Sequence, residues 1–463
     1  MPHESIPVRP GRFWGDESHI VRDVFEWAAN RVVLDTDPKT TARPASELKA
    51  EAGQTITPEG IGGAEAMRVF TEVLAPSTRA QDDPMNLAYI PAAPTRSAIA
   101  FDMATSAANI FGGLWEAGAG AIFAENEALA WLIDLLKWPD TASGVFAAGG
   151  TMGNLSALHA ARASAKHKRI EAGLSPKPEG GWAIACAASS HSSISNAADV
   201  LDVDVIWVEE NSDGRLDGPG LRAAIGDQAE RVFAVSATAG STNAGIVDDL
   251  SSIADYCGEF GIWMHVDGAY GGAGLCAPSL RDRYVGIERA NSMIVDPHKW
   301  LFAPYDCCAL IYRDARDARA AHTQVASYLD TIDREAPNPS DLAIHLSRRA
   351  RGLPFWFSLA THGTDAYVAA VEQTVKTAHE VADWIKSAHH LTLLREPDLT
   401  VLLFEHVGWG PEDYMRWSRR MALEGDILCL PTKWHGRVVL RLAFVNPATK
   451  ASDVKAVLEH MPL

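Results

Sequence analysis

Short apolar runs alternate with longer helical patterns between about residue 110 and residue 365, and this alternation restricts the possible folds more than any other feature. Seven runs have the character of strands: VFAA, WAIACAA, VDVIWVE, RVFAVSA, IWMHVD, SMIVD and CALIYRD. Helical stretches such as NLSALHAARASAKHKRIEAG lie between them. This order predicts an α/β fold in which a mostly parallel seven-stranded sheet is covered by helices on both faces.

The alternation also divides the chain into three parts. Residues 1–110 mix short helical patterns with proline-rich turns such as YIPAAPT, and we expect them to form an arm that packs on something else. Residues 111–372 hold the seven runs and form a large domain. Residues 373–463 hold the runs LTVLLFEHV and GRVVLRLAFV, which predicts a small α+β domain. The helix that leads into it has apolar residues at Val371, Val375, Ala378, Ala382 and Ile385.

The charge balance argues against two classes of partner. The chain has 41 basic and 59 acidic side chains and a formal net charge of −18. Nucleic acids and anionic membranes both favour clustered Lys and Arg, so we expect neither as a partner. Residues 111–136 are the most apolar long segment, but four acidic side chains interrupt it: Glu116, Glu125, Glu127 and Asp134. The segment predicts a core helix and loop rather than a membrane span.

Six cysteines lie scattered in apolar runs without the CxxC spacing of metal sites. We expect buried free thiols and no metal, which suits a reducing compartment. The start of the chain, MPHESIPVRPGRFWGDE, lacks the apolar stretch of a secretory signal. These features predict a cytoplasmic protein.

Ligands of such sheets bind outside the carboxyl ends of the strands, so the residues after each run are the informative ones. Gly149 and Gly150 follow VFAA and precede the cap residues Thr151 and Asn154 and a helical pattern. A glycine-rich turn that opens a helix offers free backbone N–H groups and a positive dipole end, which suits a phosphate. Taken alone, the ordinary alternative is a tight turn with a helix cap.

Two polar side chains follow other runs. Asp267 ends IWMHVD, where a carboxylate is costly unless it is paired; the alternative is an aspartate that caps a helix or a turn. His191 follows WAIACAA, and a lone histidine at such a place is more often structural than catalytic.

Lys299 follows SMIVD in the stretch VDPHKWLFAPYD. A solvated lysine is the ordinary interpretation, but the apolar residues around it favour a buried one. A buried lysine has a lowered pKa and can attack a carbonyl group as a neutral amine.

Together the strand ends supply what pyridoxal phosphate requires: a phosphate cradle, a carboxylate for the pyridinium nitrogen, an aromatic ring over the cofactor and a lysine for its aldehyde. Asp267 and Lys299 are 32 residues apart, about one crossover unit, so both can reach one cofactor from adjacent strands.

The stretches HVDGAYGG, DPHKW, SSHSS and GGTMGNLSAL resemble the group II pyridoxal-phosphate-dependent amino-acid decarboxylases of the aromatic-L-amino-acid decarboxylase type. The resemblance runs from Met85 to the C-terminus. It implies an aminotransferase-like (type I) fold and a homodimer with active sites at the interface, in which residues 1–110 pack on the partner subunit.

By this resemblance, Lys299 binds the cofactor covalently and Asp267 pairs with the pyridinium nitrogen. Ala269 lies under the ring, and His191 stacks on its other face. The remaining cofactor positions are Thr151, Met152, Gly153, Thr242, Asp296 and His298.

Two of these positions depart from the pattern of the family. Asp296 stands where many relatives have Asn, and a second negative charge beside a phosphate is unfavourable unless it is hydrogen-bonded or protonated. Gly153 stands where aromatic decarboxylases often have Ser, so one hydroxyl donor is missing.

Tyr328 matches the loop tyrosine that returns a proton to the substrate after CO₂ leaves, and relatives with Phe there tend to form aldehydes. The resemblance therefore implies decarboxylation of an L-amino acid to an amine. The alternative is that Tyr328 only packs the loop.

An apolar, aromatic substrate slot is implied by six positions: Tyr89, Ile90, Pro91, Ala92, Trp115 and Ser347. It suits tyrosine, Dopa, tryptophan or phenylalanine, with Trp115 contributed by the partner subunit. The same residues could instead fill an interface core.

Four other functions remain open: a decarboxylase of glutamate, aspartate or diaminobutyrate, an aldehyde synthase, a carbon–carbon lyase, or a non-catalytic homologue. Lys299, Asp267 and His191 are intact, which argues against the last.

Overall fold

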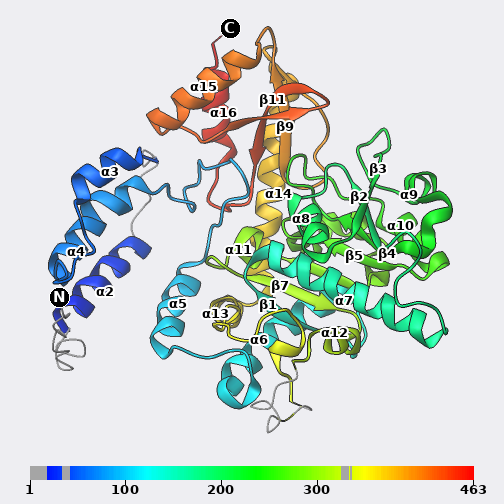
Figure 1. The fold of residues 1–463 in the computed structure, drawn as a ribbon. Coiled ribbons are helices and arrows are strands. Elements are labelled where there is room, and N and C mark those ends of the chain that lie inside the picture. The colour runs from blue at the N-terminus through cyan, green and yellow to red at the C-terminus, as the bar shows by residue number, and fades with distance from the viewer. Residues whose placement is uncertain (1–17, 34–41, 325–332, 334–335, 463) are drawn as a thin grey trace, which may run out of the picture.

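A seven-stranded sheet forms the centre of the protein (Figure 1). The computed structural model describes residues 18–33, 42–324, 333 and 336–462. The strand order is β1-β7-β6-β5-β4-β2-β3, and only β7 runs against the others. The strands are β1 (Ser143–Ala147), β2 (Ala183–Ala187), β3 (Asp204–Val208), β4 (Val232–Thr238), β5 (Trp263–Asp267), β6 (Ser292–Val295) and β7 (Cys308–Tyr312). They coincide with the seven predicted runs, which confirms the mostly parallel sheet.

Helices cover both faces of this sheet. One face packs against α7 (Gly149–Glu171), α8 (Ser192–Leu201) and α12 (Ala315–His322). The other packs against α6 (Trp115–Leu136), α9 (Gly218–Ile225), α10 (Leu250–Phe260) and α14 (Thr364–Ser387). Successive side chains of a strand point to opposite faces, so Val145 of β1 joins the first core and Phe146 joins the second. The strand ends are thus held rigidly from both sides.

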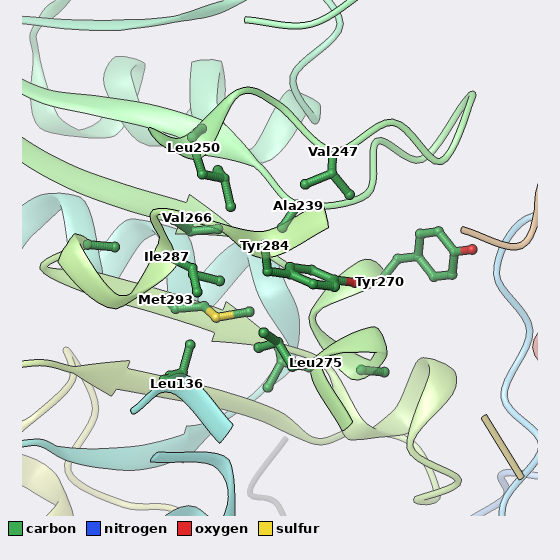
Figure 2. Close-up of a cluster of buried hydrophobic side chains, with 14 of the residues drawn as sticks. Leu136, Ala239, Val247, Leu250, Val266, Tyr270, Leu275, Tyr284, Ile287 and Met293 are labelled. Atoms are coloured by element: carbon green, nitrogen blue, oxygen red, sulfur yellow. The ribbon is translucent and has the colours of Figure 1, made fainter. Parts of the chain in front are cut away.

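The second core reaches up to the loop that follows β5. Figure 2 shows Val266 and Met293 on neighbouring strands, with Tyr284 and Leu275 packed beside them. Each fully buried side chain of this size contributes about 1.5–3 kcal/mol. The loop also approaches the end of β4 closely, because a Cβ on Gly271 would lie 2.3 Å from the carbonyl oxygen of Ala239. This packing fixes the loop that follows Asp267.

A small domain follows α14 and is built on four antiparallel strands in the order β10-β11-β9-β8. Its elements are β8 (Leu391–Leu393), β9 (Val401–His406), α15 (Pro411–Glu424), β10 (Leu430–Trp434), β11 (Arg437–Ala443) and α16 (Ala451–Glu459). The predicted α+β domain is confirmed, as are the two predicted strands, which correspond to β9 and β11. The sequence did not indicate β8, which has three residues, or β10, which contains Pro431.

The N-terminal helices lie to one side of the body, in blue in Figure 1. They are α2 (Ser18–Val33), α3 (Ala45–Ala52) and α4 (Gly63–Val69), followed by the π-helical turn η1 (Phe70–Leu74) and η2 (Ala75–Ser77). In contrast, α5 (Arg96–Ala108) packs on α13 (Leu353–His362) of the body, where the rings of Phe101 and Phe357 stack at 4.0 Å. Packing of residues 1–110 on a partner subunit stays a prediction.

Short helices complete the described chain: η3 (Gly226–Arg231), η4 (Gly271–Cys276), η5 (Pro278–Tyr284), η6 (Ile287–Arg289), α11 (Pro297–Trp300) and η8 (Pro339–Asp341). All six cysteines are buried and none forms a disulfide, as predicted. In the described ranges, no helix combines the length and the apolar character that a membrane span needs.

The segment predicted as core helix and loop forms α6, and its acidic residue Glu125 is buried. Arg348 binds the Glu125 carboxylate through two hydrogen bonds of 2.7 and 2.6 Å, and the backbone nitrogen of Gly352 adds a third at 2.8 Å. The two charged side chains are only 3% and 2% exposed. A buried carboxylate is therefore tolerated here because it is fully paired.

Candidate active site

A cavity of about 250 Å³ lies at the edge of the large sheet where the parallel strands end. Its walls come from the turns after β1, β2, β4, β5 and β6. All of the predicted cofactor residues line this cavity except Met152 and Gly153. The strand ends that the sequence singled out thus meet in one place.

The turn after β1 forms one end of the cavity. Gly149 has a φ of +78°, a conformation that favours glycine, and α7 begins at this residue without a side-chain cap. A Cβ on Gly150 would lie 3.2 Å from Oδ2 of Asp296, so the turn sits close against the end of β6. Gly149, Gly150 and Thr151 line the cavity beside the free N–H groups of the helix. This arrangement fits a phosphate.

Gly153 packs against the sheet. A Cβ at this position would lie 2.8 Å from Cγ2 of Ile294 and 2.9 Å from Sγ of Cys308. Aromatic decarboxylases often have a serine at this position. Its hydroxyl could not be accommodated here, because the close contact of α7 with β6 and β7 excludes any side chain. Met152 belongs to the same helical turn and does not line the cavity.

Asp267 ends β5 and is 6% exposed. Its Oδ2 accepts a hydrogen bond of 2.9 Å from Nδ2 of Asn154, and its Oδ1 accepts one of 3.1 Å from the backbone nitrogen of Ala269. Both partners are donors, and the carboxylate faces the cavity, where it suits a protonated ring nitrogen.

His191 is the N-cap residue of α8, and its Nδ1 accepts a hydrogen bond of 3.2 Å from the backbone nitrogen of Ser193. The ring lines the cavity and remains exposed at its rim. Thr242 lines the cavity from the loop after β4.

Lys299 lies in α11, and the residue after it, Trp300, is fully buried and fixes the helix. The Nζ atom of Lys299 lies 3.0 Å from Oδ2 of Asp296, and the lysine side chain is 23% exposed. Burial by itself lowers the pKa of Lys299, but the carboxylates of Asp296 and Asp267 outweigh it and raise the pKa above the ordinary value. The expected lowering of this pKa is therefore wrong, because the sequence did not reveal how close Asp296 lies.

His298 and Tyr305 extend the site beyond Lys299. Burial lowers the pKa of His298, whose Nδ1 lies 2.9 Å from the backbone nitrogen of Cys307. The rings of His298 and Tyr305 are 4.8 Å apart. Sequence reasoning missed Tyr305, although it belongs to the same stretch, VDPHKWLFAPYD.

Arg441 of β11 is a further residue that sequence reasoning missed. Its guanidinium donates to the carbonyl oxygens of Thr242 (2.6 and 3.0 Å), Asn243 (3.2 Å) and Tyr89 (2.7 Å). Among the described residues, none forms an ion pair with it. Burial lowers the pKa of Arg441 to about 10, so it stays charged at neutral pH. An arginine in the apolar run GRVVLRLAFV was the available signal.

The predicted substrate residues do not line the cavity within this chain. Tyr89 is 67% exposed, whereas Ile90, Pro91 and Ala92 are buried. Trp115 is half-buried at the start of α6, and Ser347 is exposed. Tyr328 lies outside the described residues, so its role stays a prediction.

The cavity fits pyridoxal 5′-phosphate by three independent features: an uncapped helix start with a glycine turn, a buried carboxylate held by hydrogen bonds and a lysine amine. In addition, Oδ1 of Asp296 is buried and has no hydrogen-bond partner within the described part of the chain. No cluster of three or more metal-ligating side chains occurs there either.

Comparison with known sequences gives relatives over most of the chain. One is an aromatic-L-amino-acid decarboxylase from Bacillus atrophaeus, 26% identical over 449 residues and covering 92% of each chain. Another is an L-2,4-diaminobutyrate decarboxylase from Rhizobium meliloti (strain 1021), 33% identical over 376 residues, or 78% of this chain and 74% of the relative.

Solved structures show the same fold. Oryza sativa TDC with PLP and tryptamine superposes with a TM-score of 0.85 at 23% identity, over 99% of this chain and 98% of the other. Mouse CSAD gives a TM-score of 0.86 at 24% identity, over 96% and 98%. The family described as "Pyridoxal-dependent decarboxylase conserved domain" matches residues 64–407, the greater part of the chain. With its lysine, carboxylate and phosphate cradle in one cavity, the chain therefore belongs to the pyridoxal-phosphate-dependent decarboxylases, which are carboxy-lyases of amino acids.

Proposed function

We propose that this decarboxylase acts on an aromatic L-amino acid and releases the corresponding amine and CO₂. Family membership establishes the carboxy-lyase reaction and the cofactor; the aromatic substrate is the proposal. The observation that carries it is the apolar, aromatic surface beside the lysine, formed by Tyr305 and the segment that contains Ala92.

This surface begins next to the cavity. The hydroxyl of Tyr305 bonds to the backbone of Ala92, and its ring lies 4.8 Å from that of His298. A groove of about 800 Å³ is lined by Ala92, Pro304 and Tyr305 together with Trp27 and Phe70, and by the charged side chains of Arg31, Arg79 and Asp82. The aromatic rings and prolines of this lining favour contact with an aromatic side chain.

The residues of the chain then have distinct tasks. The bound cofactor supplies an electron-poor ring that accepts the electron pair left when CO₂ departs. Asp267 keeps the ring nitrogen protonated, and the turn at Gly149 holds the phosphate. Asp296 can exchange a proton with Nζ of Lys299 at 3.0 Å. Arg441 holds the loop of Thr242, which lines the cavity, and Tyr328 is proposed to return the final proton.

A second candidate substrate is L-2,4-diaminobutyrate, favoured by the 33% identity with the Rhizobium meliloti enzyme. The discriminating experiment incubates the cofactor-loaded protein separately with tyrosine, Dopa, tryptophan, phenylalanine, 2,4-diaminobutyrate, glutamate and aspartate. CO₂ and products are read by mass spectrometry. We expect a kcat/KM for one aromatic acid at least about tenfold above that for diaminobutyrate, a difference of about 1.4 kcal/mol. A preference for diaminobutyrate or an acidic substrate overturns the aromatic proposal, and aldehyde in place of amine overturns the assignment of Tyr328.

We also propose a homodimer in which the N-terminal arm lies on the partner subunit. Apolar side chains of α2 are exposed, among them Val21 at 49% and Phe25 at 50%. A chain of 49.9 kDa should then elute with twice that mass in light scattering, whereas Phe25→Asp should shift the population toward the monomer. A monomeric wild type refutes the proposal.

The free, buried cysteines support a cytoplasmic location.

A further inference from the structure

We propose that Asn154 is a positioning residue that holds Asp267 for its pairing with the ring nitrogen of the cofactor and, through Ser193, holds His191 at the rim of the cavity. The inference depends on the cofactor but not on which amino acid is the substrate. It concerns a hydrogen-bond network that lies behind the wall of the cavity.

Asn154 stands at the centre of this network. It belongs to α7, is 1% exposed and uses both ends of its amide. Its Nδ2 donates to Oδ2 of Asp267 at 2.9 Å and to Oγ of Ser193 at 2.8 Å. Its Oδ1 lies 2.8 Å from Nε2 of His265. One side chain of α7 therefore joins β5 and the start of α8.

The partners of Asn154 fix its orientation. Oδ2 of Asp267 accepts from the amide nitrogen, so the amide oxygen faces His265. That oxygen needs a donor, so Nε2 of His265 carries a proton. Burial lowers the pKa of His265 to about 4, which leaves the ring neutral and its Nδ1 bare at neutral pH.

Ser292 of β6 extends the hydrogen-bond network beyond His265. Oγ of Ser292 lies 2.8 Å from Nδ1 of His265 and 2.8 Å from Nε1 of Trp263. The indole can only donate, so Ser292 accepts from Trp263 and donates to His265. The protons of the chain Trp263, Ser292, His265 and Asn154 then all point toward Asp267. In this arrangement every donor of the chain from Trp263 to Asp267 meets an acceptor.

The other branch reaches the rim of the cavity. Because Oγ of Ser193 accepts from Asn154, its own hydrogen is free to be donated to Nδ1 of His191, 2.9 Å away. The backbone nitrogen of Ser193 donates to the same Nδ1 at 3.2 Å. A neutral His191 ring therefore carries its proton on Nε2. Asn154 thus sets both the carboxylate and the histidine that face the cofactor.

The first test compares two ligands that differ only at the ring nitrogen. Cofactor-depleted protein is titrated with pyridoxal phosphate and with its analogue in which the ring nitrogen is replaced by C–H, and both dissociation constants are read from absorbance. Their ratio measures the interaction of Asp267 with the protonated nitrogen. Asp267→Asn sets the lower limit of this ratio.

In Asn154→Ala we expect the preference for pyridoxal phosphate to fall by about tenfold, since a hydrogen bond to a charged acceptor changes an equilibrium by roughly tenfold to a hundredfold. Asn154→Leu fills the space but donates no hydrogen bond, so the preference for pyridoxal phosphate should fall by the same factor. This variant replaces Asn154→Ala if the alanine variant does not fold. A purely structural defect weakens both ligands equally, so an unchanged ratio in either variant overturns the proposal.

The matched control is Ser236→Ala. Ser236 is 1% exposed on β4, and within the described residues its Oγ has no partner. This variant should keep the wild-type ratio. In contrast, Ser193→Ala should weaken both ligands by the same factor, about fivefold, because His191 covers the ring whether or not it contains nitrogen. Unchanged affinities in Ser193→Ala refute the His191 branch. Both tests can succeed or fail whatever the substrate proves to be.

Discussion

Replacing Asp296 by Asn should make the protein bind its cofactor faster. Asp296 and Lys299 form an ion pair at 3.0 Å in a largely buried setting. At an effective dielectric constant of about 20, the Coulomb attraction at this distance is about 5 kcal/mol, and desolvation of both charges offsets part of it. A net stabilisation of about 1.5–3 kcal/mol for the charged amine is typical of such a bond.

Covalent capture of the cofactor requires the neutral amine, and the phosphate is repelled by the same carboxylate. Asp296→Asn removes both obstacles. Since Asp296 raises the pKa of Lys299, its loss moves that pKa down and increases the neutral fraction at pH 7. The net stabilisation given above corresponds to a rate increase of roughly tenfold to a hundredfold.

Stopped-flow absorbance after mixing cofactor-depleted protein with pyridoxal phosphate between pH 6 and pH 9 measures this rate. The wild-type rate should climb as the pH rises, and the variant should reach its plateau at a lower pH. Asp306→Asn makes the same change of charge nearby, at a residue that pairs with Arg351, and should stay within about twofold of wild type. Superimposable profiles for Asp296→Asn and wild type would refute the reasoning.

Three further outcomes are expected. Lys299→Ala should fold, as judged by circular dichroism, but should show no turnover and no mass increase after incubation with cofactor and borohydride. An active variant would contradict the assignment of Lys299 as the residue that binds the cofactor covalently. Arg348→Met leaves Glu125 buried without its charged partner and should lower the free energy of unfolding in urea by about 3–5 kcal/mol. The double variant Glu125→Leu/Arg348→Met should recover part of this loss. Equal losses in the single and the double variant would mean that the pair is not coupled. Burial lowers the pKa of His322 to about 4, below its value in the unfolded chain, so its contribution to stability is complete above about pH 6.5 and is lost as the pH falls toward 4. Between pH 7 and pH 5 the loss of unfolding free energy from this group amounts to about 2 kcal/mol. His322→Gln should therefore reduce the difference in unfolding free energy between these two pH values by about 2 kcal/mol. An unchanged difference would show that His322 does not cause this pH dependence.

The large sheet was predictable because each strand is a short apolar run bounded by turn residues, and because one strand direction brings the polar residues after β1, β2, β5 and β6 to one edge. The roles that depend on exact distances were not. The pairing of Asp296 with Lys299 results from the tight turn into α11, and it reversed the expected pKa shift. Gly153 had been interpreted as a lost hydroxyl, whereas the packing of α7 on β6 excludes a side chain there.

The substrate pocket was the least predictable part. Its expected residues, among them Tyr89 and Trp115, come from segments far from Lys299 in the sequence, and none of them lines the cofactor cavity in this chain. Periodicity can indicate that such a segment is apolar, but not which surface it meets. The network around Asn154 was missed for a related reason: it connects residues of four elements, and each of them looks ordinary in its own stretch.

The hydrogen bonds of Arg441 have a consequence for the order of folding. Its guanidinium joins β11 to the loop at Thr242, 199 residues earlier, and to Tyr89, 352 residues earlier. Contacts between such distant segments close late, because the entropy of loop closure opposes them until the separate parts have formed. A chain with only its large sheet in place would have Lys299 and Asp267, but its Thr242 loop, which lines the cavity, would not yet be held by Arg441. Full affinity for substrate should therefore appear only after the small domain has docked, later than the first capture of cofactor.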